Sequence, residues 1–564
     1  MTITTQDVHR KAAELIAEGQ PFALRDFTVD GATFRGFANA PRDLVQLLQM
    51  GRAHGDAIFL VHGGRRLSYR EFFEQVDALA GLLRSRYGIG RGDRVAIAMR
   101  NSPEWMIAFV AGALCGAILV PLNSWGRAEE LCHGLRDSDA RVLVCDGARH
   151  ALLDGAAPCE LILATDPGEL APTGATTLGS LVEQGAANAF EPAAVDPQDI
   201  AMILYTSGST GSPKGAAHRH IGAAQALMNM FYLGFLTVSV EGARELRAGA
   251  ERETALLTVP LFHATGLVAG LLMPLQRGHK VVMMPRWDTV EALRLIQDEK
   301  VTGLTSVPTI VQSLLAHPQF GEFDTRSLFR VSLAGAATPT GLPELIETRI
   351  QSPSRSTGWG MTETLSVGAT MSGAIYDLNP ASAGLCSPLV EMRFVDSAGQ
   401  VLPAGETGEL QVRGITVCAG YWNHPQASAA IRDGEWMRTG DLARIDDAGF
   451  LHIVGRIKEI VIRGGENIYP GEIEQAAYEL EQIREAVVFG VPDAQMGEEL
   501  AMVAYAPAGA ALTPERLRGF LEGRLARYKV PRYIELVSEP LPQNASGKLF
   551  KRQLRDEFIA AKSR

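Results

Sequence analysis

At 564 residues, the chain is too long for one ordinary hydrophobic core, so we expect two or more domains. It is 46% hydrophobic and 21% charged, as is usual for globular proteins, and its net charge of −11 opposes a broad nucleic-acid-binding surface. The six cysteines show neither a CxxC pair nor metal-ligand spacing, which predicts reduced thiols in a cytoplasmic enzyme.

The N-terminal half of the chain alternates between helical and strand patterns. The first 19 residues are polar and charged, so no secretory signal is predicted. A helix is predicted where apolar residues repeat at helical spacing, namely at Phe72, Phe73, Val76, Leu79, Leu82 and Leu83. Strands are predicted at 94–99, 142–145, 161–164, 280–284 and 329–333. A helix is predicted at 288–300, with a capping box of Asp288 and Glu291. Such alternation indicates parallel sheets covered by helices on both faces.

Residues 105–122 are the one stretch that we compare with a membrane span, because they are almost wholly apolar. The stretch is short for a span, contains Gly112 and Gly116, and ends at Val120 and Pro121. We therefore predict a buried helix running into a core strand, and no transmembrane segment. Residues 167–197 are predicted to form a loop, and 241–253 a charged surface insertion.

Residues 205–215 form the most informative motif, Tyr-Thr-Ser-Gly-Ser-Thr-Gly-Ser-Pro-Lys-Gly, directly after an apolar run. A strand that ends in a glycine-rich turn directs several backbone N–H groups toward one point, where phosphate oxygens bind. Ser207, Ser209 and Thr210 add hydroxyl donors, and Lys214 adds positive charge. The motif differs from Walker A, because proline precedes the lysine and glycine follows it. We therefore predict a phosphate loop of another kind.

Further motifs follow in order along the chain. Residues 259–266 read Val-Pro-Leu-Phe-His-Ala-Thr-Gly, and 356–364 read Ser-Thr-Gly-Trp-Gly-Met-Thr-Glu-Thr, with Leu-Ala-Gly-Ala-Ala at 333–337 upstream. Arg-Thr-Gly-Asp at 438–441 precedes Gly-Arg-Ile-Lys-Glu at 455–459. The segment 462–473 is rich in glycine, and 541–548 read Leu-Pro-Gln-Asn-Ala-Ser-Gly-Lys.

Together these motifs resemble the adenylate-forming superfamily, which includes acyl-CoA synthetases, firefly-type luciferases and the adenylation domains of nonribosomal peptide synthetases. The resemblance runs from about residue 67 to residue 548. It implies an α/β fold with a large N-terminal domain, residues 1–456, whose parallel sheets are sandwiched by helices. It also implies a small mobile C-terminal α+β domain, residues 457–564, with Lys458 as the hinge. Within that domain we predict strands at 487–491, 502–506 and 533–537, and a helix at 514–527 capped by Thr513.

The resemblance also implies a nucleotide site. In it, Trp359 would stack on adenine, Asp441 would accept hydrogen bonds from the ribose, and Glu363 with Thr210 would hold Mg²⁺. The implied catalytic residues are Lys548, Lys214, Thr362 and Glu363. The implied nucleotide contacts are Thr206, Ser207, Gly208, Ser209, Thr210, Gly211, Lys214, Gly335, Ala336, Ala337, Gly358, Trp359, Gly360, Met361, Thr362, Asp441, Arg456 and Lys548.

An acyl pocket and a CoA channel complete the implied site. His263 would lie beside the carboxylate of the acid. The other implied pocket residues are Phe231, Tyr232, Gly335 and Gly360. Met228, Phe231, Tyr232 and Phe235 are close to helical spacing, and they either line this pocket or pack in the core. Residues 462–473 resemble the version found in synthetases for fatty and other hydrophobic acids, in which Arg463, Gly464 and Gly465 would border the CoA channel.

The resemblance implies an ATP-dependent, AMP-forming acid:CoA ligase, that is, an acyl-CoA synthetase. A carboxylate attacks the α-phosphorus of Mg·ATP, giving acyl-AMP and pyrophosphate, and the thiol of CoA then displaces AMP while the small domain rotates. The expected acid is hydrophobic, a medium- or long-chain fatty acid. Three alternatives stay open: an aryl or alicyclic acid ligase, an acyl-AMP ligase that loads a carrier protein, and a non-catalytic acyl- or nucleotide-binding relative. We expect small-molecule partners, no nucleic acid, and a homodimer or monomer; peripheral membrane contact is compatible with these features.

Overall fold

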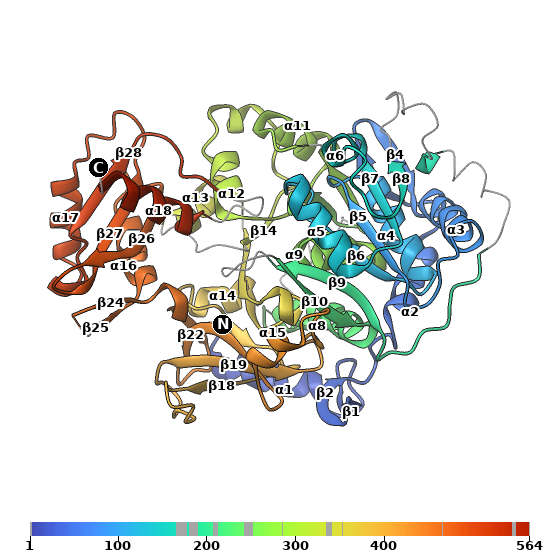
Figure 1. Cartoon of the computed structure of the whole chain (residues 1–564), viewed down its shortest axis with the longest axis horizontal. Helices are drawn as coiled ribbons and strands as arrows, with labels where there is room; N and C mark the ends of the chain where they lie inside the picture. The colour runs from blue at the N-terminus through green and yellow to red at the C-terminus, as the bar shows by residue number, and fades with distance from the viewer. Residues whose placement is uncertain are drawn as a thin grey trace.

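The computed structural model describes residues 3–164, 177–179, 190–206, 213–241, 252–284, 286–333, 341–351, 353–464, 466–543 and 549–562. Two large sheets form the centre of the molecule, and helices pack around them (Figure 1). The first sheet has seven strands. In spatial order they are β20 (Gly420–Tyr421), β10 (Lys214–Arg219), β9 (Ile200–Thr206), β6 (Ile118–Pro121), β5 (Arg94–Ala98), β7 (Val142–Asp146) and β8 (Glu160–Ala164).

The second sheet has nine strands. In spatial order they are β17 (Leu385–Cys386), β16 (Ala369–Ser372), β15 (Ser354–Trp359), β14 (Arg330–Leu333), β13 (Gly303–Ser306), β11 (Thr254–Leu257), β12 (Lys280–Met283), β3 (Ile58–His62) and β4 (Arg65–Ser68). Most pairs in both sheets are parallel. The antiparallel pairs are β20–β10 and β10–β9 in the first sheet, and β17–β16, β16–β15 and β3–β4 in the second. The predicted α/β class with parallel sheets is therefore confirmed.

Helices cover these sheets because their apolar faces need a partner. α4 illustrates this, since all twelve of its residues are buried and Ser102 caps its first turn. The α-helices outside the C-terminal part are α1 (Thr5–Ile16), α2 (Leu44–Gln49), α3 (Tyr69–Ser85), α4 (Pro103–Leu114), α5 (Ala128–Ser138), α6 (Gly147–Leu153), α8 (His220–Glu241), α9 (Ala264–Leu267), α10 (Met273–Arg277), α11 (Thr289–Glu299), α12 (Pro308–Leu315), α13 (Leu342–Arg349), α14 (Gly373–Leu378) and α15 (Pro425–Ala430). A hairpin of β1 (Leu24–Val29) and β2 (Ala32–Phe37) lies near α8.

Two further sheets complete the chain. The third is wholly antiparallel, which the sequence did not predict, and contains β18 (Val390–Val395), β19 (Gly408–Gly414), β22 (Trp436–Ile445), β21 (Arg432–Asp433) and β23 (Leu451–Arg456). The fourth contains β25 (Glu466–Ile468), β24 (Val461–Arg463), β27 (Gly497–Tyr505), β26 (Glu485–Asp493) and β28 (Tyr533–Val537), with helices α16 (Pro470–Tyr478), α17 (Pro514–Glu522) and α18 (Lys551–Lys562). The single turn η5 (Ile457–Glu459) joins these sheets. A domain boundary at residue 456 stays a prediction.

The predicted strands and helices recur with small shifts, and two helices differ in detail. α11 begins after Asp288, whose carboxylate accepts the Glu291 N–H at 2.8 Å, but the Glu291 carboxylate pairs with Arg294 rather than completing a capping box. α17 keeps the predicted Thr513 cap but ends at Glu522 instead of residue 527.

The apolar stretch 105–122 forms the buried helix α4 and the core strand β6, as predicted. Among the described residues, a different helix, α8, is the one that is long and apolar enough to cross a bilayer, so singling out residues 105–122 for comparison with a membrane span was wrong. α8 meets the criterion for a membrane span by its length and composition alone. Of its most apolar 18-residue window, 61% is buried inside the molecule, as expected for a core helix. Most of the segments 167–197 and 241–253 lie outside the described residues.

Candidate active site

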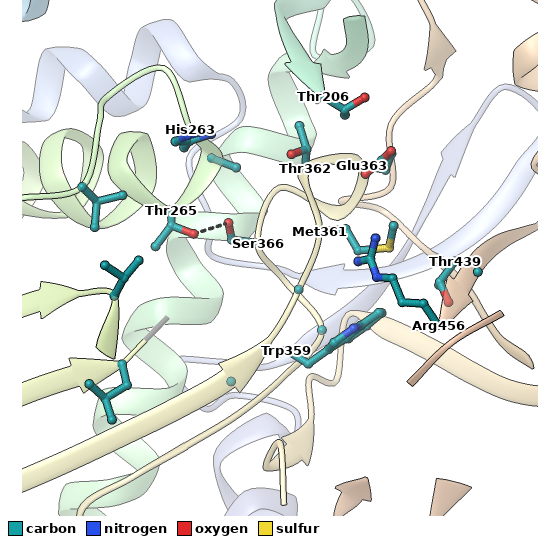
Figure 2. Close-up of a pocket in the computed structure, with 18 of the residues that line it drawn as sticks. Thr206, His263, Thr265, Trp359, Met361, Thr362, Glu363, Ser366, Thr439 and Arg456 are labelled. Atoms are coloured by element: carbon teal, nitrogen blue, oxygen red, sulfur yellow. Dashed lines mark hydrogen bonds between the residues drawn. The ribbon is translucent and has the colours of Figure 1, made fainter. Parts of the chain in front are cut away.

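The predicted motifs converge on one cavity of about 1620 Å³. The parallel strands β13, β14 and β15 reach it at Ser306, Leu333 and Trp359. Ligands of open α/β sheets bind beyond the carboxyl ends of parallel strands, so the topology itself favours a ligand site here. The fourth sheet and α18 also contribute lining residues, among them Gly490 and Lys551. Figure 2 shows the part of the cavity around Trp359, Glu363 and His263.

The phosphate-loop motif connects two neighbouring strands, because Thr206 at the end of β9 pairs with Lys214 at the start of β10. Both residues line the cavity. The Lys214 ammonium lies 5.8 Å from the centroid of the Tyr421 ring. The predicted phosphate contacts between these strands lie outside the described residues: Ser207, Gly208, Ser209, Thr210 and Gly211.

A carboxylate that the motifs did not reveal supports β9 just before this loop. The Tyr205 hydroxyl donates to Asp137 Oδ2 at 2.6 Å, and His424 Nε2 lies 2.9 Å from Asp137 Oδ1. Asp137 belongs to α5, and its side chain is only 8% exposed. Since Asp137 is 68 residues from Tyr205 and 287 from His424, no local pattern in the sequence joins the three.

The second half of the Trp-Gly-Met-Thr-Glu motif forms the short helix η4 (Thr362–Thr364). Glu363 is buried, and its Oε1 accepts the Tyr421 hydroxyl at 2.8 Å. Burial and the adjacent carboxylate raise the pKa of Tyr421, so it remains a donor. On β10, burial lowers the pKa of His218 to about 4, and the nearby backbone of Thr362 acts in the opposite direction. No local motif indicated that Tyr421 and His218 lie at this site.

Glu363 suits a magnesium ion that is shared with substrate phosphates. Among the described residues, no group of three or more His, Cys, Asp or Glu side chains could hold a metal ion. Mg²⁺ is commonly bound by one or two carboxylates together with phosphate oxygens, so a single cavity-facing carboxylate fits this ion. The other predicted ligand, Thr210, is outside the described residues.

Trp359, Asp441 and Arg456 form a hydrogen-bonded cluster. Trp359 Nε1 donates to Asp441 Oδ2 at 2.9 Å, and Arg456 Nε lies 2.8 Å from Asp441 Oδ1. Asp441 and Arg456 face each other across the β22–β23 pair, and the Asp441 side chain is only 3% exposed. The predicted adenine and ribose residues therefore touch, and Figure 2 shows Trp359 and Arg456 on the same side of the cavity.

The backbone around Trp359 is tightly packed against the following loop. A Cβ on Gly360 would lie 2.6 Å from the Ser366 carbonyl oxygen, so glycine is needed at this close approach. Ser366 itself has a φ of 62°, in the left-handed region. Its hydroxyl is 3.2 Å from that of Thr265, a contact drawn in Figure 2 between the loop and α9. Gly358, Met361 and Thr362 also line the cavity.

The predicted acyl-pocket residues are divided between the cavity lining and other parts of the structure. His263 lines the cavity at the start of α9, and Gly360 lines it too. From α8, however, the lining residues are Asn229, Met230 and Leu233.

The predicted residues Phe231 and Tyr232 point elsewhere, because neighbouring helical positions are about 100° apart. Tyr232 is buried, with its ring centroid 5.6 Å from that of Phe37, and Phe231 lies under Arg277. Phe235 is 54% exposed, and Met228 is not among the lining residues. None of these four side chains of α8 is therefore among the lining residues of the cavity, and Tyr232 packs in the core while Phe235 is exposed. Gly335, Ala336 and Ala337 lie outside the described residues.

The predicted hinge and CoA residues lie around η5 and β24. Lys458 is exposed and lines the cavity. The Arg463 guanidinium is held by both oxygens of Glu499, with Nη2 3.0 Å from Oε2. Gly464 has a φ of 60°, a conformation that favours glycine. Gly465 and Lys548 lie outside the described residues.

Comparisons with known proteins agree with this geometry. The family model described as AMP-binding enzyme matches residues 48–422, and that of the AMP-binding enzyme C-terminal domain matches residues 472–548. A feruloyl-CoA synthase of Amycolatopsis sp is 35% identical over 503 residues, which cover 88% of this chain and 95% of the relative. A long-chain-fatty-acid–CoA ligase of Bacillus subtilis (strain 168) is 31% identical, over 88% of this chain and 90% of the relative. The crystal structure of an anthranilate CoA ligase in complex with anthranoyl-AMP superposes with a TM-score of 0.82 at 26% identity, covering 93% of this chain and 98% of the other.

Proposed function

Because the chain belongs to the family of AMP-binding enzymes, we propose that it joins a hydrophobic carboxylic acid to CoA through an acyl-adenylate. Its family and relatives identify the chain as an AMP-forming acid–thiol ligase, with ATP and CoA as substrates. The observation that carries the proposal is that Trp359 and Arg456, which hold Asp441 between them, line the same cavity as the implied acyl-side residues His263 and Gly360.

The proposed first step joins two anions, so positioning and charge matter most. Trp359 and Asp441 would hold adenine and ribose, while Lys214 and Thr362 would contact the phosphates. His263 would lie beside the carboxylate of the acid. Mg²⁺, when bound through Glu363, would reduce the repulsion between the phosphates and that carboxylate. Lys548 would approach the same oxygens from the C-terminal domain. No protein nucleophile is required.

In the proposed second step, the small domain turns about Lys458, withdraws Lys548 and opens a path for the CoA thiol. Gly464 and Gly465 would border this path. The position of η5 supports rotation about Lys458, because η5 is a single turn between the third and fourth sheets and Lys458 is exposed within it. A homodimer or a monomer is compatible with this mechanism.

Two classes of acid are candidates for the substrate. We keep medium- or long-chain fatty acids as the first expectation, since the segment 462–473 resembles that of fatty acyl-CoA synthetases and one relative is named a long-chain-fatty-acid–CoA ligase. Ring-containing acids are the second candidate, because another relative is named a feruloyl-CoA synthase. Transfer to a carrier protein, in place of CoA, remains an alternative for the acceptor.

Pyrophosphate release across a panel of fatty, aryl and alicyclic acids, with and without CoA, tests the function. We expect release only when ATP, Mg²⁺ and an acid are present, and thioester only when CoA is added. Formation of ADP instead of AMP would contradict the mechanism. Acyl-AMP that accumulates and is not consumed by CoA would favour the carrier-loading alternative.

A further inference from the structure

One buried amide interrupts the apolar α8 wall of the cavity. Asn229, Met230 and Leu233 form this wall, because positions three and four apart share a helix face. Met230 and Leu233 are apolar, whereas Asn229 carries a carboxamide and is only 2% exposed. A buried amide that lacks hydrogen-bond partners costs free energy, so its partners identify its role.

Ser387 fixes the orientation of this amide. The Ser387 hydroxyl accepts the Leu389 N–H at 3.1 Å and donates its own proton to Asn229 Oδ1 at 2.7 Å. The carboxamide oxygen is therefore satisfied. Within the described part of the chain, the Asn229 Nδ2 group has no recorded partner, although it carries two N–H donors.

Other hydroxyl groups that line the cavity differ from Asn229. Thr265 and Ser366 hydrogen bond to each other, and Thr370 donates to the Thr357 carbonyl at 2.8 Å. These side chains satisfy themselves within the protein. Asn229 instead lines the cavity with an amide group that can donate hydrogen bonds. The other lining residues of α8, Met230 and Leu233, are apolar.

We propose that Asn229 determines acid specificity by donating a hydrogen bond to an oxygen on the hydrophobic part of the substrate. The preferred acid would then carry a hydroxyl, ether or keto oxygen remote from its carboxylate, on either a ring or a chain. This inference rests on the proposed function, in which the carboxylate lies beside His263 and the nucleotide against Trp359. It narrows the substrate class to oxygen-substituted hydrophobic acids.

Matched acids test the inference directly. One pair is 3-phenylpropanoic acid and its 4-methoxyphenyl analogue, and a second is octanoic acid and 7-oxooctanoic acid. In the wild type, we expect kcat/KM to be roughly ten- to a hundredfold higher for the oxygenated member of at least one pair. Asn229→Leu should abolish this preference and leave the KM for ATP unchanged. Met230→Leu, on the same helix face, should change both members of a pair alike.

The controls separate folding from recognition. Asn229→Asp keeps the size of the side chain but replaces its N–H donors by an acceptor, so it should also lose the preference for the oxygenated acid. Its melting temperature, compared with that of the wild type, checks that the variant is folded. Equal kcat/KM values within both pairs for the wild type, or a preference that survives Asn229→Leu, would overturn the inference. If the wild type activates no acid, the proposed function fails. Calorimetry then still decides the role of Asn229, by comparing how the wild type and Asn229→Leu bind the two acids of each pair.

Discussion

At the scale of single residues, the contact between Trp359 and Asp441 gives one side chain two roles. The indole ring is the implied adenine platform, while its N–H group holds the carboxylate that is expected to bind ribose. Arg456 holds the other oxygen of the same carboxylate. In the proposed site, recognition of the base and of the sugar would therefore be coupled through the Trp359–Asp441 hydrogen bond, which tyrosine or phenylalanine at this position would not reproduce.

Trp359→Phe should keep a stacking surface but release Asp441. We expect the KM for ATP to rise by about tenfold, the usual effect of losing one hydrogen bond to a charged group, with a smaller change in kcat. Initial-rate measurements of pyrophosphate release would show this. The matched control is Trp436→Phe, because Trp436 packs against Arg393 outside the cavity lining. Equal KM values for the two variants would contradict the proposed coupling.

Three buried histidines should make the folded protein less stable in mild acid. Burial lowers the pKa of His218, His220 and His279 to about 4, from an ordinary value of 6.5. Below that ordinary value the unfolded chain binds more protons than the folded one, so stability is full at neutral pH and falls as the pH drops toward 4.

Each of these histidines should cost about 2 kcal/mol near pH 5. We expect the melting temperature to fall steeply between neutral pH and that value. His279→Asn should make this decline shallower, even if it lowers the melting temperature at neutral pH. A pH dependence as steep in the variant as in the wild type would show that other groups cause it.

At the scale of secondary-structure elements, the turn η5 is tied to the start of α18. Lys551 Nζ lies 2.8 Å from Glu459 Oε2 and 3.0 Å from Glu474 Oε1. Burial alone would lower the pKa of Lys551, but the two carboxylates raise it overall, so this ammonium stays charged. Since Glu459 directly follows Lys458, this anchor fixes the C-terminal side of the predicted hinge to α18.

Lys458→Pro should separate the two half-reactions, because proline fixes φ and stiffens the turn. Acyl-AMP should still form, while thioester formation slows. Lys458→Ala is the control, since it removes the same side chain and keeps the backbone free. Quenched-flow measurement of both steps would decide. An equal loss of both steps in folded Lys458→Pro, or an equal effect of the two substitutions, would remove the hinge assignment.

At the scale of the whole molecule, the cavity joins parts of the chain that are far apart in sequence. β15 of the second sheet and the short helix η4 line it together with residues of β26 and α18. Figure 1 shows the fourth sheet and its helices at one side of the molecule, next to the larger body. The resemblance to adenylate-forming enzymes is confirmed by both family models. Movement of the small domain remains a proposal.

Lys548→Ala tests this movement. We expect adenylation to slow by roughly a hundred- to a thousandfold, the effect of removing one charge-stabilising donor. Thioester formation from synthetic acyl-AMP should be almost unchanged, because the lysine would have left the site by then. Lys562→Ala, at the far end of α18, should affect neither step. A comparable slowing of the second step in folded Lys548→Ala would mean that the lysine acts in both conformations.

The sequence by itself determined the class of fold, the family and the order of the motifs. Buried strands and amphipathic helices have periodicities that can be counted, which is why α3, β5 and β7 were predicted close to their bounds. Motif residues such as Lys214 and Asp441 were identified because their neighbours along the chain carry the signature. Local patterning did not reveal the antiparallel third sheet, whose pairing depends on contacts between strands.

The tertiary structure alone decided which side chains meet. Tyr421 reaches Glu363 across 58 residues, and Asp137 reaches His424 across 287, so no spacing rule could join them. Helical spacing placed Phe231 and Tyr232 on the helix that lines the cavity, but a helix has several faces, and only its packing against Phe37 turned Tyr232 inward and left Asn229 toward the cavity. The physical reason is that periodicity fixes the relative directions of side chains on one element, whereas the contacts between elements fix what each direction faces.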